Sequence, residues 1–158
     1  MLIDRVLKRY PAAAVLAAVD ANLKDRAEKN LRSTAARDLG STGIKLKRVH
    51  NPGILMGRGH EDPPAVTAFT GGLLTLFMLG NRKALGGSKG TVRSISANLV
   101  AAGAASNLRD RIKYGYVVDY FSLPVKKIRN VYFNLGDLMI VSGSLLYILS
   151  GWTEKGRK

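Results

Sequence analysis

Residues 63–81 read PPAVTAFTGGLLTLFMLGN, and no charged side chain interrupts them. At a rise of about 1.5 Å per residue, a helix of this length measures about 28 Å, which is close to the hydrocarbon thickness of a bilayer. This stretch therefore predicts a helix that spans a membrane. It indicates a helical membrane protein, and the other apolar runs of the chain can be compared with it.

Three other apolar runs extend this interpretation outward from residues 63–81. Residues 94–108 are uncharged and rich in Ala, Gly and Ser, which suit close contacts between helices inside a membrane. Residues 133–152 form a similar run that only Asp137 interrupts. The run 11–19 is weaker, because charged residues flank it on both sides, and it fits a soluble amphipathic helix equally well.

We expect a mainly α membrane protein with a four-transmembrane-helix bundle in a single membrane domain, residues 1–158. The expected segments are helices at about 6–23, 63–81, 93–108 and 132–152, with polar caps at about 24–62 and 109–131. Residues 44–49 and 116–121 have the alternation or the β-branched and aromatic content of strands, so the cap contains β-structure. Both caps then lie on one side of the membrane, and both termini lie on the other.

The composition restricts the chemistry and the partners. The chain has no cysteine, which excludes disulfides, zinc–thiolate sites and thiol nucleophiles, and we expect no metal or other cofactor. The net charge of +14 indicates an anionic partner. Nucleic acid is not expected, since no reader motif or aromatic–basic interleaving is present, so anionic membrane lipids remain. Lys45, Lys47 and Arg48 would face lipid headgroups or, in the plainer interpretation, solvent.

Two aspartates near the C-terminus are candidates for chemistry. Asp119 ends the second expected strand, and Asp137 lies about one turn inside the last expected helix, so both belong to the cap end of the bundle. A carboxylate at the mouth of an apolar helix is costly and marks a functional site. Two converging carboxylates can share one proton, so that one activates water while the other protonates the carbonyl oxygen or the leaving amine.

The plainer interpretation is that each aspartate caps a helix or pairs with a basic side chain. The neighbouring residues count against it. Asn134 lies three residues before Asp137 on the same helix face, and Asn107, Asp110 and Arg111 end the third expected helix at the same level. Polar residues at the ends of apolar helices commonly face the interior of the bundle.

Five short blocks appear in a familiar order and spacing. They are DANLK at 20–24, NPG at 51–53, GAASNLRDR at 103–111, GYVVDY at 115–120 and FNLGD at 133–137. With these blocks, the chain resembles the bacterial lipoprotein signal peptidases, or signal peptidase II, a family of four-helix intramembrane aspartyl peptidases. The resemblance covers most of the chain, and the last three blocks together are the specific ones.

The resemblance implies a role for each block. Asp119 and Asp137 would be the catalytic dyad. The residues that orient the dyad and hold the loop backbone would be Asn107, Asp110, Arg111 and Asn134. The residues that support the first cap and the substrate or inhibitor site would be Asp20, Lys24 and Asn51. Gly53 and Gly103 belong to the same blocks and complete the expected site.

The resemblance also implies the reaction. The family cleaves the signal peptide of a prolipoprotein just before a cysteine that carries diacylglyceryl. The expected location is the bacterial cytoplasmic membrane, with several crossings, both termini cytoplasmic and the active site at the extracytoplasmic face. The excess of Lys and Arg on the cap side would by itself place the caps in the cytoplasm, and the resemblance overrides that count. We expect a monomer.

The blocks depart from the family pattern at several positions. Ala21 replaces the usual Gln, Ser106 a Gly and Gly136 an Ala, while residues 54–56 replace a small-then-aromatic run. These differences keep an alternative open: a catalytically impaired or re-specialised paralogue that binds lipidated peptides in the membrane. A soluble nucleic-acid binder is a third hypothesis, which rests on the charge alone.

Overall fold

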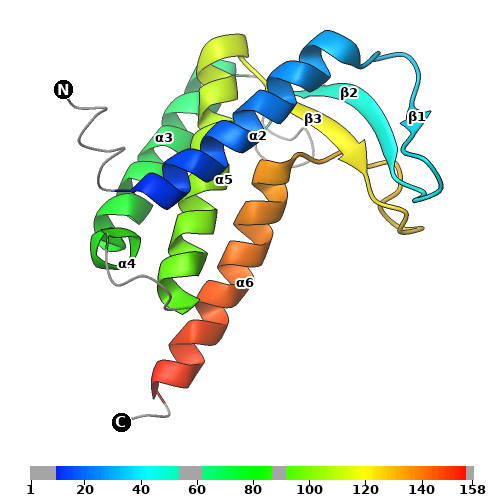
Figure 1. Cartoon of the computed structure of the whole chain (residues 1–158). Coiled ribbons are helices and arrows are strands. Elements are labelled where there is room, and N and C mark those ends of the chain that lie inside the picture. Colours follow the sequence, from blue (N-terminus) through cyan, green and yellow to red (C-terminus); the bar gives the residue numbers. More distant parts are fainter. Residues whose placement is uncertain (1–9, 54–61, 87–91, 156–158) are drawn as a thin grey trace.

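The computed structural model describes residues 10–53, 62–86 and 92–155 (Figure 1). Within these ranges the chain is mainly helical, with a small sheet at one end of the helices. The helices are α2 (Pro11–Asn30), α3 (Pro63–Gly80), α4 (Arg82–Gly86), α5 (Val92–Tyr114) and α6 (Leu135–Lys155). The strands are β1 (Arg37–Asp38), β2 (Lys45–Asn51) and β3 (Val117–Ser122). This confirms the mainly α class with a β-containing cap.

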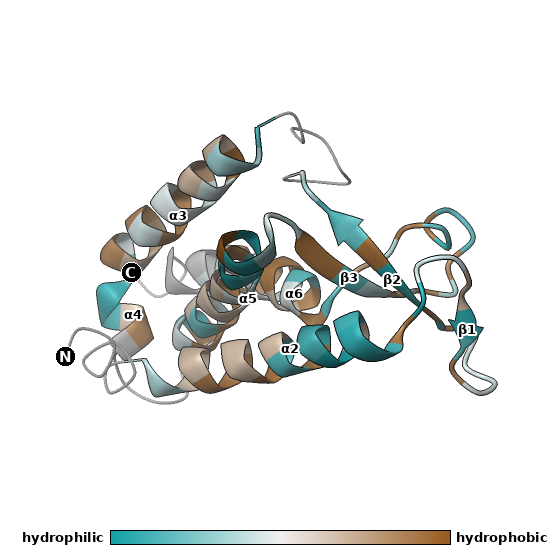
Figure 2. Ribbon diagram, turned by 90° about the horizontal axis from the view of Figure 1, so that it is seen from above, coloured by the Kyte–Doolittle hydropathy of each residue, from teal (hydrophilic) through white to brown (hydrophobic). Residues whose placement is uncertain are grey.

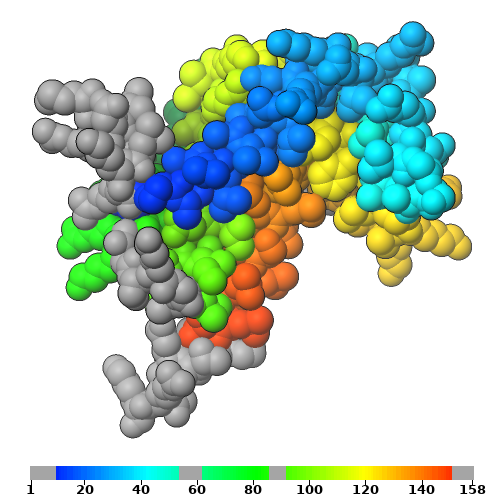
Figure 3. Space-filling model, viewed as in Figure 1, coloured from blue at the N-terminus to red at the C-terminus, as the bar shows by residue number. Residues whose placement is uncertain are grey.

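The three strands form one antiparallel sheet in the order β1-β2-β3. In the register of β2 and β3, Val49 lies opposite Asp119 and Asn51 lies opposite Val117. An isolated bridge between Phe121 and Phe133 then brings the segment before α6 alongside β3. In the space-filling view the strands form a lobe beside the helices (Figure 3). The sheet therefore brings Asn51, Asp119 and the start of α6 together.

Helix α5 lies between the other long helices and packs against α2, α3 and α6 (Figure 2). Up to Ser106 its buried face consists mostly of small residues, and Ala97 and Ala102 are completely buried. A Cβ atom on Gly143 of α6 would lie 2.9 Å from both Leu99 and Val100 side-chain atoms of α5. The expectation that small residues allow close helix contacts is confirmed, because α5 and α6 approach where side chains are absent or short.

Two helix ends differ from the expected boundaries because charged residues prolong the helices. The first described helix runs to Asn30 instead of 23, and α5 runs to Tyr114 instead of 108. Arg109 donates to both carboxylate oxygens of Asp25, at 3.0 and 2.6 Å, and Tyr114 donates to the same carboxylate. An apolar run ends where its helix leaves an apolar environment. The bonds between Asp25 and the end of α5 continue both helices beyond that point.

The last helix begins later than expected, at Leu135 rather than 132. The backbone N–H of Asp137 donates to the Asn134 side chain, while the Asp137 carboxylate accepts the backbone N–H of Asn134. These reciprocal bonds are those of a capping box, and they make Asn134 the residue at which the helix starts. Phe133 is held in the bridge to β3 and is not part of the helix.

The described helices differ in their suitability for a membrane. By length and composition, α3 is the one helix of the described ranges that could cross a bilayer, and only 6% of it is buried. The apolar part of α6, Leu135–Ser150, is shorter. The expected segment 63–81 agrees with α3. Residues 1–9, which include the start of the expected helix 6–23, and residues 54–56, which depart from the family pattern, lie outside the described residues.

Candidate active site

The two aspartates lie at the cap end of the bundle on different elements. Asp119 is in the middle of β3 rather than at the end of the strand, where it was expected, and it is 3% exposed. Asp137 lies in the first turn of α6. The strand pairing and the capping box described above fix these two positions. The expectation that both carboxylates belong to one end of the molecule agrees with this arrangement.

Asn134 connects the two carboxylates. Its side-chain Nδ2 donates to Oδ1 of Asp119 at 2.7 Å, and its backbone N–H donates to Oδ2 of Asp137 at 3.1 Å. Its Oδ1 accepts the backbone N–H of Asp137 at 2.9 Å. Asn134 is completely buried, so a single residue without access to solvent sets the positions of both acidic groups.

Two further asparagines bind the remaining carboxylate oxygens, one on each aspartate. Asn51 donates from Nδ2 to Oδ2 of Asp119 at 3.1 Å, and Asn107 donates from Nδ2 to Oδ1 of Asp137 at 3.0 Å. Each of the four oxygens therefore accepts one N–H bond. Carboxylate oxygens have further lone pairs, so this arrangement orients the groups and still leaves them able to bind a water molecule.

Burial, and after it the charge of Asp137, raise the pKa of Asp119 from 3.8 to about 7. The amide bonds from Asn134 and Asn51 act in the opposite direction and only partly offset these two effects. Near neutral pH the Asp119 carboxyl group is therefore present in both protonation states. This is the property expected of a group that exchanges a proton during a reaction.

Lys24 of α2 fixes the orientation of the Asn107 amide. Its Nζ donates to Oδ1 of Asn107 at 2.6 Å and to Oγ of Ser106 at 3.2 Å. Because an ammonium group can only donate, Asn107 presents its oxygen to Lys24 and its N–H group to Asp137. Lys24 is itself completely buried, and Asp20 at 3.0 Å and Asp110 at 3.5 Å balance its charge.

Arg111 and Asp110 tie the end of α5 to the cap. Arg111 donates from Nη2 to the carbonyl oxygen of Gly53 at 2.7 Å, and the N–H of Gly53 donates to Oδ1 of Asn51 at 3.2 Å. This chain of bonds turns the Asn51 N–H group towards Asp119. Asp110 accepts the backbone N–H of Val118 at 3.2 Å and so holds β3 at the residue next to Asp119.

Two glycines allow the elements of the site to approach. A Cβ atom on Gly103 would collide with the carbonyl oxygen of Gly136 and lie 2.9 Å from Ile140. A Cβ atom on Gly136 would lie 2.7 Å from Oδ2 of Asp20 and 2.9 Å from Oδ1 of Asn134. Gly136, where the family pattern has Ala, therefore lies where the Asp20 and Asn134 side chains leave no room for a Cβ atom.

A comparison with protein families matches residues 12–153 to the model of signal peptidase II. The matched range includes every residue of the site described above. The chain belongs to the signal peptidase II family. Membership implies a peptidase, which is a hydrolase of peptide bonds.

Similar proteins carry the name of the same family. The lipoprotein signal peptidase of Moorella thermoacetica is 28% identical over 92% of this chain and 95% of that protein. The lipoprotein signal peptidase of Halothermothrix orenii is 40% identical, but the similarity spans only 39% of this chain and 40% of that protein. A solved bacterial membrane enzyme has the same fold, with a TM-score of 0.81 and 18% identity over 96% of this chain and 91% of that chain.

The structure of this signal peptidase II relative brings the expected site residues together. The residues that connect to either carboxylate directly or through one neighbour are Asn51, Gly53, Asn107, Arg111, Asn134 and Lys24. Asp20 and Lys24 lie on α2, completely buried against α5, where Lys24 contacts Asn107.

Two hydroxyl groups of the site were not among the expected residues. The Tyr120 hydroxyl accepts the backbone N–H of Leu135 at 3.2 Å, and Ser106 accepts a bond from Lys24. The position of Tyr120 directly after Asp119 was the one signal in the sequence that could have indicated its place in the site. Its partner is a backbone group fifteen residues away, so no spacing in the sequence indicates the contact.

Proposed function

We propose that this chain removes the signal peptide of diacylglyceryl-modified prolipoproteins by cleaving the peptide bond before the lipidated cysteine. Asp119 and Asp137 would carry out the reaction as an aspartyl pair that activates a water molecule. The observation that carries the proposal is the single buried residue, Asn134, that binds both carboxylates. The names of the similar proteins from Moorella and Halothermothrix support the substrate class.

In the proposed mechanism, Asp137 accepts a proton from the water as its oxygen bonds to the carbonyl carbon. Asp119 provides the acid, because its raised pKa keeps a proton available near neutral pH. It donates this proton to the carbonyl oxygen, which gives a gem-diol. Asp137 then passes the proton taken from the water to the amine nitrogen as the C–N bond breaks, and Asp119 recovers a proton from a gem-diol hydroxyl as the new carboxyl group forms. The amides of Asn51, Asn107 and Asn134 hold both groups in place during these transfers.

We further propose that the bundle crosses the bacterial cytoplasmic membrane four times as a single-domain monomer. The termini would be cytoplasmic and the sheet extracytoplasmic. The exposed apolar surface of α3 supports this arrangement, since such a helix is costly in water. A diacylglyceryl group anchors the substrate cysteine in the bilayer, so the bond to be cleaved would lie near the membrane boundary, as the two aspartates do in this proposal.

A gel-shift cleavage assay with a purified diacylglyceryl-modified proprotein tests the mechanism. Asp119→Asn and Asp137→Asn should each abolish cleavage, while Asp38→Asn should retain it, because Asp38 is exposed on β1 away from the site. All three changes remove one carboxylate and keep the side-chain size. Full activity of either Asp119→Asn or Asp137→Asn would disprove the dyad. Tight binding without turnover by the unaltered protein would instead favour a lipid-peptide binding module.

A further inference from the structure

A cavity of about 730 Å³ lies at the end of the bundle opposite the two aspartates. Its lining residues come from the end of α3, from α4 and from the start of α5: Leu79, Gly80, Asn81, Arg82, Lys83, Ala84 and Arg93. Arg93 and Asn107, both on α5, are separated by about 21 Å of helix. The cavity is therefore remote from the candidate active site.

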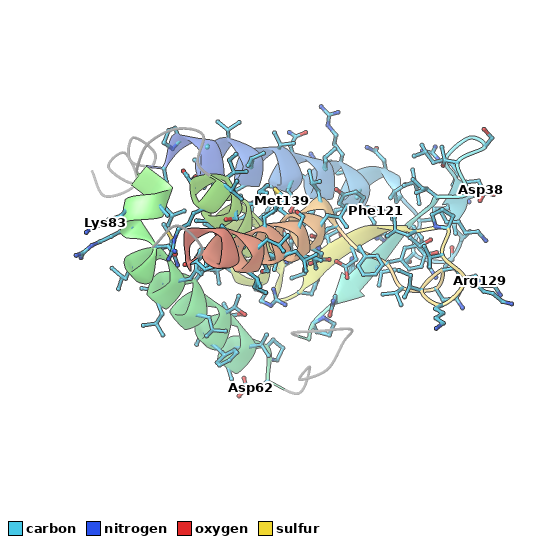
Figure 4. The ribbon with its side chains drawn as sticks, turned by 90° about the horizontal axis from the view of Figure 1, so that it is seen from below. Asp38, Asp62, Lys83, Phe121, Arg129 and Met139 are labelled. Atoms are coloured by element: carbon cyan, nitrogen blue, oxygen red, sulfur yellow. The ribbon has the colours of Figure 1, made fainter. Side chains whose placement is uncertain are left out.

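The charge of the cavity is positive. Among the described residues, its lining contains three cationic side chains, Arg82, Lys83 and Arg93, and no carboxylate. Figure 4 shows Lys83 at the opposite end of the molecule from Asp38 and Arg129. A concave surface at which cationic side chains gather attracts an anion more strongly than the same charges on a convex surface, because its low-dielectric walls focus the field.

One wall of the cavity is held in place by side-chain bonds. Arg93 donates from Nη2 to the Tyr147 hydroxyl at 2.9 Å, and its guanidinium lies 5.0 Å from the centre of the Tyr147 ring. The Tyr147 hydroxyl in turn donates to Oδ1 of Asn81 at 2.6 Å. Arg93 and Asn81 therefore line the cavity in fixed positions before any ligand binds, which lowers the entropic cost of binding.

An apolar surface leads directly to this cavity. Phe69, Leu73 and Leu76 of α3 are each more than half exposed, and their spacing of four and three residues places them on one helix face. Leu79, which is also more than half exposed, continues this surface to the cavity wall. A ligand that fits both features has an apolar chain next to an anionic group.

We propose that the cavity binds the phosphate-bearing headgroup of an anionic phospholipid, whose acyl chains lie along the exposed face of α3. Arg82 and Lys83 would contact the phosphate, and Asn81 and Arg93 would form the fixed wall of the site. The site is separate from the peptidase reaction, but it rests on the proposal that α3 lies in a membrane. Its natural ligand would be a lipid of the cytoplasmic leaflet, where anionic headgroups occur.

The test uses the full-length protein in neutral detergent, titrated with short-chain phosphatidylglycerol and monitored by native mass spectrometry. The variant Arg82→Gln/Lys83→Gln should bind this lipid about thirtyfold more weakly, because it removes two charges from the headgroup site. The matched control is Lys126→Gln/Lys127→Gln, which removes two exposed adjacent charges from the loop after β3. The control should bind as the unaltered protein does.

Two comparison probes identify the source of the anionic group. Phosphatidylcholine should bind more weakly than phosphatidylglycerol, and inorganic phosphate should bind more weakly still, because it has no acyl chains to contact α3. Equal losses of phosphatidylglycerol affinity in the two double variants would overturn the proposal, since they would show a general charge effect. Inorganic phosphate that binds as tightly as phosphatidylglycerol would overturn it as well, in favour of a soluble anion.

Discussion

Asn134 combines two tasks that are usually carried out by different residues. It caps α6 through its side-chain oxygen, and through its N–H groups it binds both Asp119 and Asp137. Loss of a cap lowers stability, whereas loss of the bond to Asp119 leaves a candidate catalytic carboxylate oriented by Asn51 alone among its two amide donors. The two consequences can be measured separately, because stability and turnover are different observables.

We expect Asn134→Ala to lower kcat by about a hundredfold, because it removes a preorganised hydrogen bond from the reacting group. It should also lower the free energy of unfolding by about 1 kcal/mol through the lost cap. The cleavage assay and thermal unfolding in detergent measure these effects. The control is Asp62→Ala, which removes the cap of α3 by breaking the Ala65 N–H bond at 3.0 Å but lies outside the site. Equal losses of kcat in both variants would contradict the positioning role.

The raised pKa of Asp119 makes stability depend on pH. The folded protein keeps this proton up to about pH 7, whereas the unfolded chain releases it near 3.8. The folded state therefore binds more protons between these values, and the free energy of unfolding falls as the pH rises through this window. Asp119→Asn has no such proton to lose. Between pH 4 and pH 8 its free energy of unfolding should therefore fall by up to about 4 kcal/mol less than that of the unaltered protein.

Thermal unfolding at a series of pH values checks this expectation for Asp119. The exposed Asp38→Asn serves as the control for removal of one carboxylate, and its curve should follow that of the unaltered protein. If Asp119→Asn and the unaltered protein lost stability in parallel across pH 4 to 8, the pKa of Asp119 would not be raised in the folded state.

Among the elements, the contact of α5 with α6 depends on glycines. A Cβ atom on Gly103 would collide with α6 at Gly136, whereas a Cβ atom on Gly72 of α3 would meet nothing within 4 Å. We expect Gly103→Ala to lower the free energy of unfolding by about 1–3 kcal/mol and to reduce cleavage, because α6 carries Asp137 and would have to move. Gly72→Ala should be neutral or slightly stabilising, since Ala has the higher helix propensity.

These two glycine variants are compared by thermal unfolding and by cleavage rate under the same conditions. The same chemical change is made in both, so a difference between them reports the space around each position. A Gly103→Ala protein as stable and as active as Gly72→Ala would show that the α5–α6 contact can relax at no cost.

The elements also show how far sequence reasoning reaches. Hydropathy predicted α3 almost to the residue, because this helix is exposed and uncharged along its length. For α5, hydropathy placed the end of the helix six residues too early, because Arg109 and its neighbours are charged. Their helical state depends on Asp25 of a different helix, and no local pattern in the chain contains that information.

The candidate site follows the same division. Asp137 and Asn134 were predictable because a spacing of three residues on one helix brings them together. Asp119 and Asn107 were expected at the same level from their positions in the sequence, whereas Asn51 was included only through the resemblance of its block. The contact of Asn51 with Asp119 depends on the pairing of β2 with β3, which no local pattern indicates. The direction of the Asn107 amide was not predictable at all. It depends on Lys24, whose burial is decided by two carboxylates from α2 and α5.

For the whole molecule, the proposed membrane topology makes a prediction that the chain is well suited to test, because it contains no cysteine. Asp38 and Arg129 lie at the sheet end, and Lys83 lies at the opposite end (Figure 4). All three are exposed. In sealed spheroplasts, a membrane-impermeant maleimide should label Asp38→Cys and Arg129→Cys, whereas Lys83→Cys should react only after the membrane is permeabilised.

Each labelling result bears on a different part of the topology. Between Asp38 and Arg129 the chain passes through α3 and α5, so two crossings return it to the same side, and both positions must react alike. Labelling of Lys83→Cys alone in sealed spheroplasts would reverse the orientation and place the aspartates on the cytoplasmic side. Labelling of all three would mean that α3 does not cross the membrane. The lipid cavity at α4 would then also lose its membrane context, so this one experiment tests the setting of both proposed sites.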